Sequence, residues 1–255
     1  MPGACAATVL TALERAEKKL SKGEKVMLVE TWMSKPVITI NADDPIQKAT
    51  ALLKEKHIRI LPVMEKGKLV GIITDRDLKR ASASDANSLE IHELGYLLAK
   101  IKVKEIMTKE PITVPPCYTL EEASRILLEK KISGVPVVNE KSRVIGIITR
   151  DDLLKVLVNL TGVDKLGIQF ALQVEDSAQS IHEVTDIIRK YEGHMVSILT
   201  SYEKAPQGYR NVYIRAYRVN RGQLSQLLED LKRKAKLLYM VDHREDFRNI
   251  QYRFV

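Results

Sequence analysis

An internal repeat constrains the fold of this chain more than any other feature. Residues 29–64 align with residues 103–138 without a gap, at a shift of 74 positions, and twelve of the 36 aligned pairs are identical. After one additional residue in the second copy, GIITDRD at 71–77 aligns with GIITRDD at 146–152. Chance pairing would give about one identity in fifteen, so the chain contains two copies of one structural unit.

Each copy has the sequence pattern of a β-α-β-β-α unit. A short β segment, PVITI or PITV, precedes a stretch with apolar residues at helical spacing. Two apolar runs joined by a tight turn then indicate a β-hairpin, and a closing helix follows. We predict that the first helix begins with Asp44 as its N-cap and Pro45 at its first position. Its counterpart is predicted to begin at a capping box of Thr119 and Glu122.

Composition excludes several classes of protein. The 255 residues leave room for two domains or one large one, and 45% hydrophobic with 29% charged residues is typical of a soluble globular protein. The formal charge is +8, but basic and acidic residues are interleaved, which argues against direct nucleic-acid binding. No apolar run approaches the ~20 residues of a transmembrane helix. Cys5 and Cys117 form neither a disulfide framework nor a metal-ligand cluster, so we expect a cytoplasmic protein without a metal.

The first 26 residues differ from the rest. A second methionine, Met27, stands where the repeat begins, and the codons of Lys22–Glu24 would resemble a bacterial ribosome-binding site. We therefore expect translation to start at Met27 and residues 1–26 to be an over-extended reading frame. If that segment is translated, it is expected to form an amphipathic helix.

The repeated motifs resemble those of the cystathionine-β-synthase (CBS) domain, which occurs in tandem pairs. They are MSKPVITI, HIRILPV and GIITDRD in the first copy, and MTKEPITV, KISGVPV and GIITRDD in the second. The pairing has a physical reason, because each small sheet has an apolar face that its twin can cover.

The Thr-x-x-Asp pattern of both heptads admits two interpretations. Threonine as the N-cap with an acidic residue three positions later is a helix cap. The same helix start could also bind a ligand, since its free N–H groups suit a phosphate and an ionised aspartate can accept hydrogen bonds from two ribose hydroxyls.

The CBS resemblance implies two adenosine-nucleotide sites. One would use Thr74 and Asp77 with Met107, Ile112, Ile132 and Ser133 of the opposite copy. The other would use Thr149 and Asp152 with Met33, Ile38, Ile58 and Arg59. Apolar walls of this kind suit an adenine ring. Arg59, Arg76 and Arg150 would contact phosphate, although exposed ion-pairing arginines would look the same. The two sites are not equivalent, because Ser133 aligns with Arg59 and the larger side chain could crowd one of them.

The C-terminal third has a different pattern, β-α-β-β-α-β, which resembles the ACT domain, a ferredoxin-like module that binds amino acids and pairs edge to edge. Residues 175–180 lack the glycine that would let an amino acid approach, so dimerisation is the expected role. Tyr209, Tyr213 and Tyr217 alternate along one strand and share a face, which is either a packing surface or a ligand platform.

Together these patterns predict a mixed α+β fold, a tandem CBS pair with a ferredoxin-like ACT-like domain. The predicted parts are an N-terminal extension (1–26), CBS domain 1 (27–84), a linker with a helix (85–102), CBS domain 2 (103–160), an ACT-like domain (166–245) and a tail (246–255). This order resembles the bacterial acetoin-utilisation protein B-type family.

The resemblance implies a cytoplasmic regulatory homodimer that senses an adenine nucleotide, of the AMP, ADP, ATP or S-adenosylmethionine type, and acts on a protein partner. No cofactor is required. Catalytic motifs such as G-x-S-x-G and the P-loop are absent from the sequence, so we predict that the protein is not an enzyme. The alternative is a ligand-free dimerisation scaffold whose Thr-x-x-Asp motifs only cap helices.

Overall fold

The structure, a computed structural model, describes residues 27–85 and 100–250. The predicted N-terminal extension (1–26) and residues 86–99 of the predicted linker lie outside the described residues, as do residues 251–255. The protein divides into two compact units between Leu153 and Leu154. The first unit holds both repeats up to the start of the last helix of the second repeat. The second unit holds the rest of that helix and the C-terminal third, while the finer domain boundaries stay predictions. None of the described helices is long and apolar enough to cross a bilayer.

The first repeat has the predicted β-α-β-β-α order, preceded by a short helix. Its elements are α2 (Val29–Trp32), β1 (Ile40–Asn41), α3 (Ile46–Glu55), β2 (Ile60–Glu65), β3 (Lys68–Thr74) and α4 (Asp75–Asp85). Strand β2 pairs parallel with β1 and antiparallel with β3. Apolar side chains of α3 and the strands form one core, because the helical and strand periodicities place them on facing surfaces; it includes Ala49, Leu53, Leu61, Val63 and Ile73.

The second repeat is built in the same way. Its elements are α6 (Val103–Ile106), β4 (Thr108–Lys109), α7 (Leu120–Glu129), β5 (Gly134–Val138), β6 (Val144–Thr149) and α8 (Arg150–Thr161). Strands β5 and β6 form the predicted hairpin. The predicted first strand, PITV, is reduced to a parallel bridge between Val114 and Val137.

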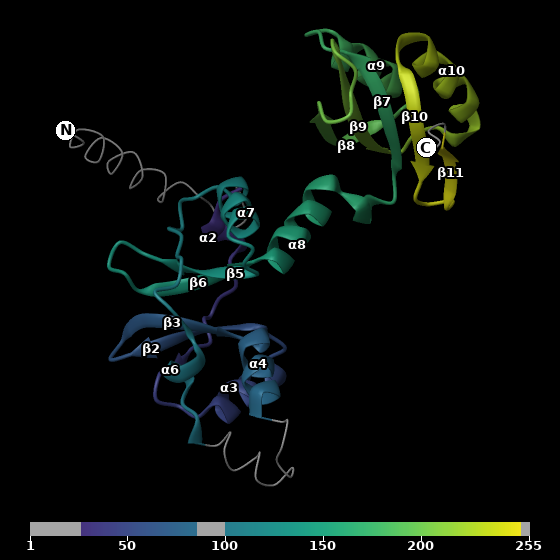
Figure 1. The fold of residues 1–255 in the computed structure, drawn as a ribbon. Helices are drawn as coiled ribbons and strands as arrows, with labels where there is room; N and C mark the ends of the chain where they lie inside the picture. Colours follow the sequence, from purple (N-terminus) through teal and green to yellow (C-terminus); the bar gives the residue numbers. More distant parts are fainter. Residues whose placement is uncertain (1–26, 86–99, 251–255) are drawn as a thin grey trace, which may run out of the picture. The chain divides into compact units, whose positions relative to one another are not determined.

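The two repeats exchange their leading segments. Strand β4 opens the second repeat but pairs antiparallel with β3 of the first, where Ile72 faces Thr108. Correspondingly, Ser34 of the first repeat exchanges backbone hydrogen bonds with Ile147 of β6. Figure 1 shows α2 beside α7, and α6 against the first repeat. Main-chain hydrogen bonds therefore join the repeats, in addition to side-chain packing.

The exchange explains the glycine of both GIIT motifs. A Cβ on Gly71 would collide with the sulfur of Met107, and a Cβ on Gly146 would collide with the sulfur of Met33. Each methionine belongs to the exchanged segment of the opposite repeat, and the two align in the sequence. Glycine is needed at these positions because the methionine lies directly over the strand backbone.

The two predicted helix starts have different outcomes. The capping box of the second repeat is confirmed: the Thr119 hydroxyl accepts from the Glu122 N–H at 3.2 Å, and Glu122 accepts from the Thr119 N–H at 2.8 Å. The prediction for the first repeat is wrong, because Pro45 is the N-cap of α3 and no side chain caps it. The Asp44 carboxylate instead accepts from the Asn41 N–H at 3.0 Å and pairs with Lys48 at 2.9 Å.

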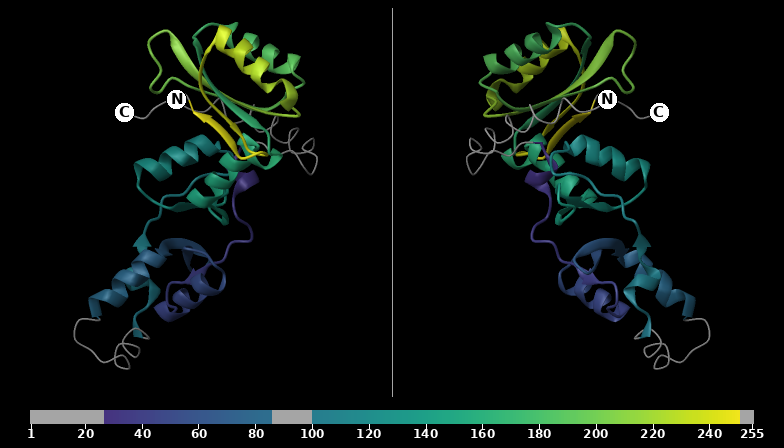
Figure 2. Two further views of the ribbon diagram at one scale, coloured as in Figure 1. Left: turned by 90° about the vertical axis from the view of Figure 1, so that its right-hand side faces the viewer. Right: turned by 90° about the vertical axis from the view of Figure 1, so that its left-hand side faces the viewer.

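The second unit is an antiparallel sheet with two helices on one face (Figure 2). Its elements are η1 (Val163–Lys165), β7 (Ile168–Glu175), α9 (Ser180–Lys190), β8 (His194–Ser201), β9 (Tyr209–Tyr217), η2 (Arg221–Gln223), α10 (Leu224–Lys234), β10 (Lys236–Asp242) and β11 (Phe247–Ile250). The strand order is β11-β10-β7-β9-β8. Without β11 this is the predicted ferredoxin-like arrangement, and β11 forms an additional edge within the predicted tail.

The core of the second unit lies between the sheet and its helices. Alternate residues of β7, among them Phe170 and Leu172, meet Val184 and Ile188 of α9 and Leu227 of α10. The confirmed part of the fold prediction is therefore a mixed α+β protein with a C-terminal antiparallel sheet.

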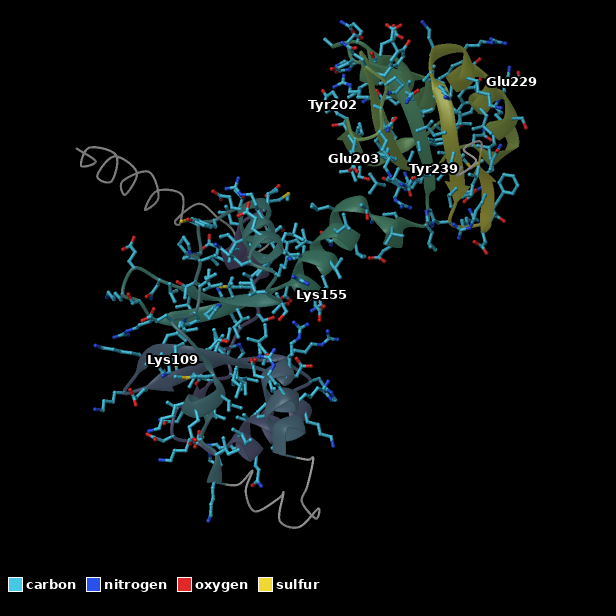
Figure 3. The ribbon with its side chains drawn as sticks, in the orientation of Figure 1. Lys109, Lys155, Tyr202, Glu203, Glu229 and Tyr239 are labelled. Carbon is cyan, nitrogen blue, oxygen red and sulfur yellow. The ribbon has the colours of Figure 1, made fainter. Side chains whose placement is uncertain are left out.

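The opposite face of the sheet is polar and aromatic. The rings of Tyr213 and Tyr239 lie 6.4 Å apart, and Arg215, only 5% exposed, donates to Gln169 at 2.9 Å. Polar and aromatic side chains also lie on the surface of this unit. Figure 3 shows two exposed examples, Glu229 on α10 and Tyr202 in the turn between β8 and β9.

Candidate functional site

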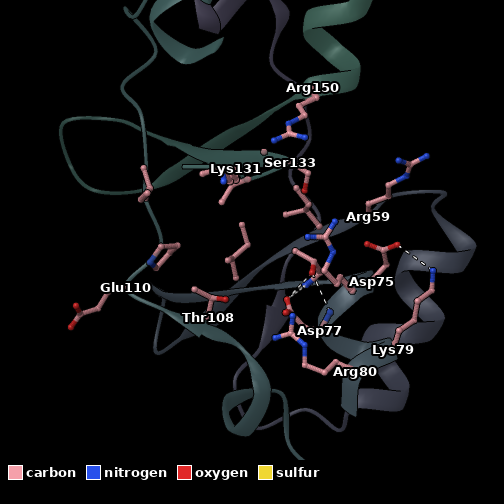
Figure 4. Close-up of a pocket in the computed structure, with 18 residues that line it drawn as sticks. Arg59, Asp75, Asp77, Lys79, Arg80, Thr108, Glu110, Lys131, Ser133 and Arg150 are labelled. Carbon is pink, nitrogen blue, oxygen red and sulfur yellow. Dashed lines mark hydrogen bonds and ion pairs between the residues drawn. The ribbon is translucent and has the colours of Figure 1, made fainter. Parts of the chain in front are cut away.

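A cavity of about 790 Å³ lies between the two repeats at the start of α4 (Figure 4). Both repeats line it, so it can only form when the pair is assembled. Eight of the residues predicted to bind nucleotide line this cavity, namely Arg59, Thr74, Arg76, Asp77, Ile112, Ile132, Ser133 and Arg150. The structure thus brings the motif of the first repeat together with three residues predicted from the second repeat, Ile112, Ile132 and Ser133.

The polar corner of this cavity is a helix cap. Asp77 Oδ2 accepts from the Thr74 N–H at 3.0 Å and from the Thr74 hydroxyl at 2.7 Å. The Thr74 hydroxyl oxygen accepts in turn from the Asp77 N–H at 3.3 Å. The second carboxylate oxygen, Oδ1, takes no part in these bonds, and the Asp77 side chain is only partly buried. The cap therefore fixes the carboxylate and leaves acceptor capacity on the cavity side.

The corresponding corner of the second repeat is closed. Asp152 Oδ2 accepts from the Thr149 N–H at 3.0 Å and from the Thr149 hydroxyl at 2.6 Å, as in the first repeat. Its Oδ1, however, accepts from the Ser34 hydroxyl at 3.4 Å, and the residue is only 6% exposed. Both oxygens of Asp152 are thus used within the protein.

The exchanged segments account for this difference. Ser34 aligns with Thr108, and the exchange places Ser34 at Asp152 and Thr108 in the wall of the Asp77 cavity. The predicted inequivalence of the two corners concerned Arg59 and Ser133. Both of these residues line the cavity at Asp77. The structure therefore places Arg59 in the wall of the Asp77 cavity, whereas the sequence had predicted it for the Asp152 site.

The remaining predicted residues lie outside the lining of this cavity. Met107, Ile38 and Ile58 pack against the core of the first repeat, and Met33 packs over Gly146. Thr149 and Asp152 form the closed corner. These six residues have packing or capping roles in the structure, and their contact with a ligand stays a prediction.

Sequence reasoning missed several basic residues of the cavity. Lys79 and Arg80 follow Arg76 on α4 at helical spacing, and Lys131 directly precedes the predicted Ile132 and Ser133. Their spacing relative to the predicted residues was a usable signal, since positions i, i+3 and i+4 share a helix face. The acidic lining residues are Asp75, Asp77 and Glu110.

A second, more open cavity of about 500 Å³ lies in the C-terminal unit. It is lined by Arg189, Glu192, Gly193, His194, Met195 and Tyr217, and the rings of His194 and Tyr217 lie 5.3 Å apart. Neither cavity holds a metal-binding cluster, because the described part of the chain contains no group of three or more His, Cys, Asp or Glu side chains suited to a metal ion.

Comparison with known protein families gives a match in both repeats. The sequence profile of the CBS domain matches residues 29–84 and 103–159. A CBS domain-containing protein of Dictyostelium discoideum is 36% identical over 135 residues, which are 52% of this chain and 93% of that protein. An inosine-5'-monophosphate dehydrogenase of Korarchaeum cryptofilum is 38% identical over 137 residues, or 54% of this chain. The chain spans only 26% of the dehydrogenase.

Two solved structures are also similar to this chain. The CBS domain pair of protein MJ0100, solved with 5-methylthioadenosine and S-adenosyl-L-methionine, is 32% identical with a TM-score of 0.46, covering 52% of this chain and 98% of that chain. A putative acetoin utilization protein from Vibrio cholerae is 26% identical with a TM-score of 0.46, covering 55% of this chain and 96% of that chain.

Proposed function

This chain belongs to the CBS-domain family, with a tandem pair in residues 29–84 and 103–159, and from that premise we propose that it is a regulatory protein that binds an adenine nucleotide between its repeats. The observation that carries the proposal is the cavity at Asp77. It joins a capped helix start of one repeat to Ile112, Ile132 and Ser133 of the other. Ligand binding would therefore depend on how the two repeats are placed relative to each other.

The groups in the cavity match the parts of a nucleotide. Ile72, Ile112, Pro111 and Ile132 provide apolar surface for a purine. Asp77 can accept hydrogen bonds from ribose hydroxyls through Oδ1 without breaking the cap, because an ionised carboxylate has about four acceptor sites. Arg76 at the start of α4 adds positive charge where a phosphate would meet the helix N-terminus.

The proposed output is a change in the C-terminal unit or in a protein partner. The ferredoxin-like sheet supports its assignment as an ACT-like domain, and its edge strand β8 exposes Ile198 and Leu199, which suits edge pairing in a homodimer. A non-enzymatic role, a cytoplasmic location and the acetoin-utilisation B-type family complete the proposal. The regulatory step would be a ligand-dependent shift in the relative orientation of the repeats.

A ligand-free scaffold is the second candidate, and one observation favours it. Both Asp77 and Asp152 accept hydrogen bonds from their own threonine, as simple helix caps do. At Asp152 nothing more is needed to explain the residue, because Ser34 engages the other oxygen. At Asp77 the cavity distinguishes the two candidates, since a cap alone does not require a hollow lined by both repeats.

Calorimetric titration with AMP, ADP, ATP, S-adenosylmethionine and 5-methylthioadenosine tests the proposal. The informative variant is Asp77→Asn, because asparagine can still accept from the Thr74 N–H and preserve the cap while losing the charge and one acceptor. We expect at least a tenfold loss of affinity in Asp77→Asn and less than a threefold change in the matched Asp152→Asn. Flat titrations with every compound would establish the scaffold instead.

A further inference from the structure

We infer that the Asp77 cavity takes a nucleotide with two or three phosphates, in preference to a monophosphate or to the sulfonium of S-adenosylmethionine. This inference rests on the proposed function, because it names the ligand class of the same site. It follows from the charges around the cavity, which exceed what a single phosphate requires.

Basic side chains outnumber acidic ones in the cavity wall. The basic residues are Arg59, Arg76, Lys79, Arg80, Lys131 and Arg150, and the acidic ones are Asp75, Asp77 and Glu110. The basic residues come from separate segments: the start of β2, helix α4, the turn before β5 and the start of α8. The wall of the cavity therefore carries basic residues from both repeats (Figure 4).

The acidic residues neutralise only part of that charge. Asp75 pairs with Lys79 at 3.7 Å, and one oxygen of Asp77 is held by Thr74. The Glu110 side chain is exposed and points away from the other labelled residues in Figure 4. The ion pairs described by the structure include none for Arg59 or Arg76.

Arginines from three separate segments line the cavity. Arg76 stands at the start of α4 beside Thr74 and Asp77, while Arg150 stands at the start of α8, with its Nη2 donating to the Leu127 carbonyl at 3.3 Å. Arg59 precedes β2, and its carbonyl accepts from the Asp75 N–H at 3.1 Å. Guanidinium groups suit phosphate oxygens because they donate paired hydrogen bonds, whereas a sulfonium would meet charge of its own sign.

The cavity also has room for such a ligand. Its volume of about 790 Å³ lies in the upper part of the usual range for small-molecule pockets, ~300–1,000 Å³. A purine against the isoleucines and a ribose at Asp77 would leave the arginine-lined part for further phosphates. At the Asp152 corner Ser34 already donates to Oδ1, so a ribose there would compete with a hydrogen bond inside the protein.

The test is isothermal titration of the full chain with ATP, ADP, AMP and S-adenosylmethionine, without Mg²⁺, at about 0.1 M and about 1 M salt. We expect ATP and ADP to bind at least ten times more tightly than AMP at low salt. That ratio should fall several-fold at high salt, where the Debye length shortens from ~10 Å to ~3 Å. The Arg76→Gln/Arg150→Gln double variant should weaken ATP and ADP binding more than AMP binding, and so lose most of the ratio. The matched control is Lys141→Gln, in the β5–β6 turn outside the cavity lining. This variant should keep the ratio of ATP to AMP affinity of the unchanged protein.

Each result decides the inference. Equal affinities for ATP, ADP and AMP, or tighter binding of S-adenosylmethionine than of ATP, would overturn it and leave the proposed nucleotide site intact. A preference for ATP that survives the double variant would overturn the assignment to these arginines. If none of the four compounds binds, both the inferred preference for two or three phosphates and the proposed function are contradicted.

Discussion

The hydroxyl of Ser34 lies 3.4 Å from Oδ1 of Asp152, although the two residues are 118 positions apart in the sequence. The contact exists because the leading segment of the first repeat is paired with β6 of the second. It is the main difference between the two otherwise similar Thr-x-x-Asp corners.

Removing the Ser34 hydroxyl should weaken the closed corner. We expect Ser34→Ala to lower the free energy of unfolding by about 0.5–1.5 kcal/mol, the usual contribution of one hydrogen bond, towards the low end because the bond is long. The matched control is Thr108→Val, which replaces the hydroxyl at the aligned position by a methyl group and should cost less. Urea unfolding measures both, and equal costs would contradict the assigned role of Ser34.

Because Met33 lies directly over Gly146, we expect a larger residue at Gly146 to destabilise the protein. Gly146→Ala should destabilise the first unit by about 1–3 kcal/mol, because the new methyl group collides with Met33, which is only 7% exposed. In a double-mutant cycle, Met33→Ala should recover part of that loss, since it removes the colliding atoms. Gly67→Ala is unsuitable as a control for crowding because Gly67 has a φ of +77°; it would report backbone strain instead.

The Arg221–Asp242 pair should make the second unit sensitive to acid. Asp242 is 2% exposed; burial raises its pKa, but hydrogen bonds from Arg221 at 2.7 and 2.9 Å and from the Arg244 N–H outweigh burial and hold the pKa below its usual value. Because the folded pKa is depressed, the stabilisation is present above the unfolded pKa of ~3.9 and is lost as the pH falls below it.

Thermal unfolding of Asp242→Asn against the unchanged protein measures this effect. The variant should be less stable by about 1–3 kcal/mol at pH 7, and the difference should shrink as the pH falls below about 4. Asp246→Asn is the control, because the Asp246 side chain is 86% exposed and pairs only with the exposed Arg248. A difference that stays constant from pH 7 to pH 3 would contradict the prediction.

We expect that replacing the buried Arg215 by an apolar residue leaves the stability of the protein unchanged or raises it. It is 5% exposed, its Nε and Nη1 have no hydrogen-bond partner, and burial lowers the pKa of its guanidinium. Replacing a buried, incompletely paired charge by an apolar side chain of similar length is often neutral or favourable. Arg215→Met should therefore leave the melting temperature unchanged or raise it. A loss of more than about 2 kcal/mol in the free energy of unfolding would contradict the prediction.

The sequence predicted the repeat, the order of its elements and much of the cavity, for a physical reason. The hairpin and the Thr-x-x-Asp corners depend on local spacing, which a single copy already contains and the second copy repeats. The order of strands in the C-terminal sheet likewise follows from the alternation of strand and helix patterns. Residues such as Thr74, Asp77 and Ile132 could be placed together because the resemblance to CBS pairs implied which positions of the two copies face one ligand.

What the sequence could not predict depends on contacts between distant segments. The closure of Asp152 by Ser34 follows from the exchange, which no local pattern indicates. Arg59 lines the Asp77 cavity for a local reason: the β2–β3 hairpin brings it to the start of α4, where its carbonyl accepts from the Asp75 N–H at 3.1 Å. The failure at Asp44 has another cause: Lys48 and the Asn41 N–H compete for its carboxylate, and both are close enough in sequence to have been considered.

The exchanged segments also determine whether the two repeats can be separated into independent fragments. The second repeat contributes the two residues of β4 to the sheet of the first, and Ser34 of the first repeat forms a β-bridge with Ile147 of β6 in the second. If the polypeptide is cut between residues 85 and 100, both fragments retain the strand that completes the opposite half. Co-expressed fragments should therefore reassemble and recover the interface, whereas either fragment alone would lack part of its sheet edge and should aggregate.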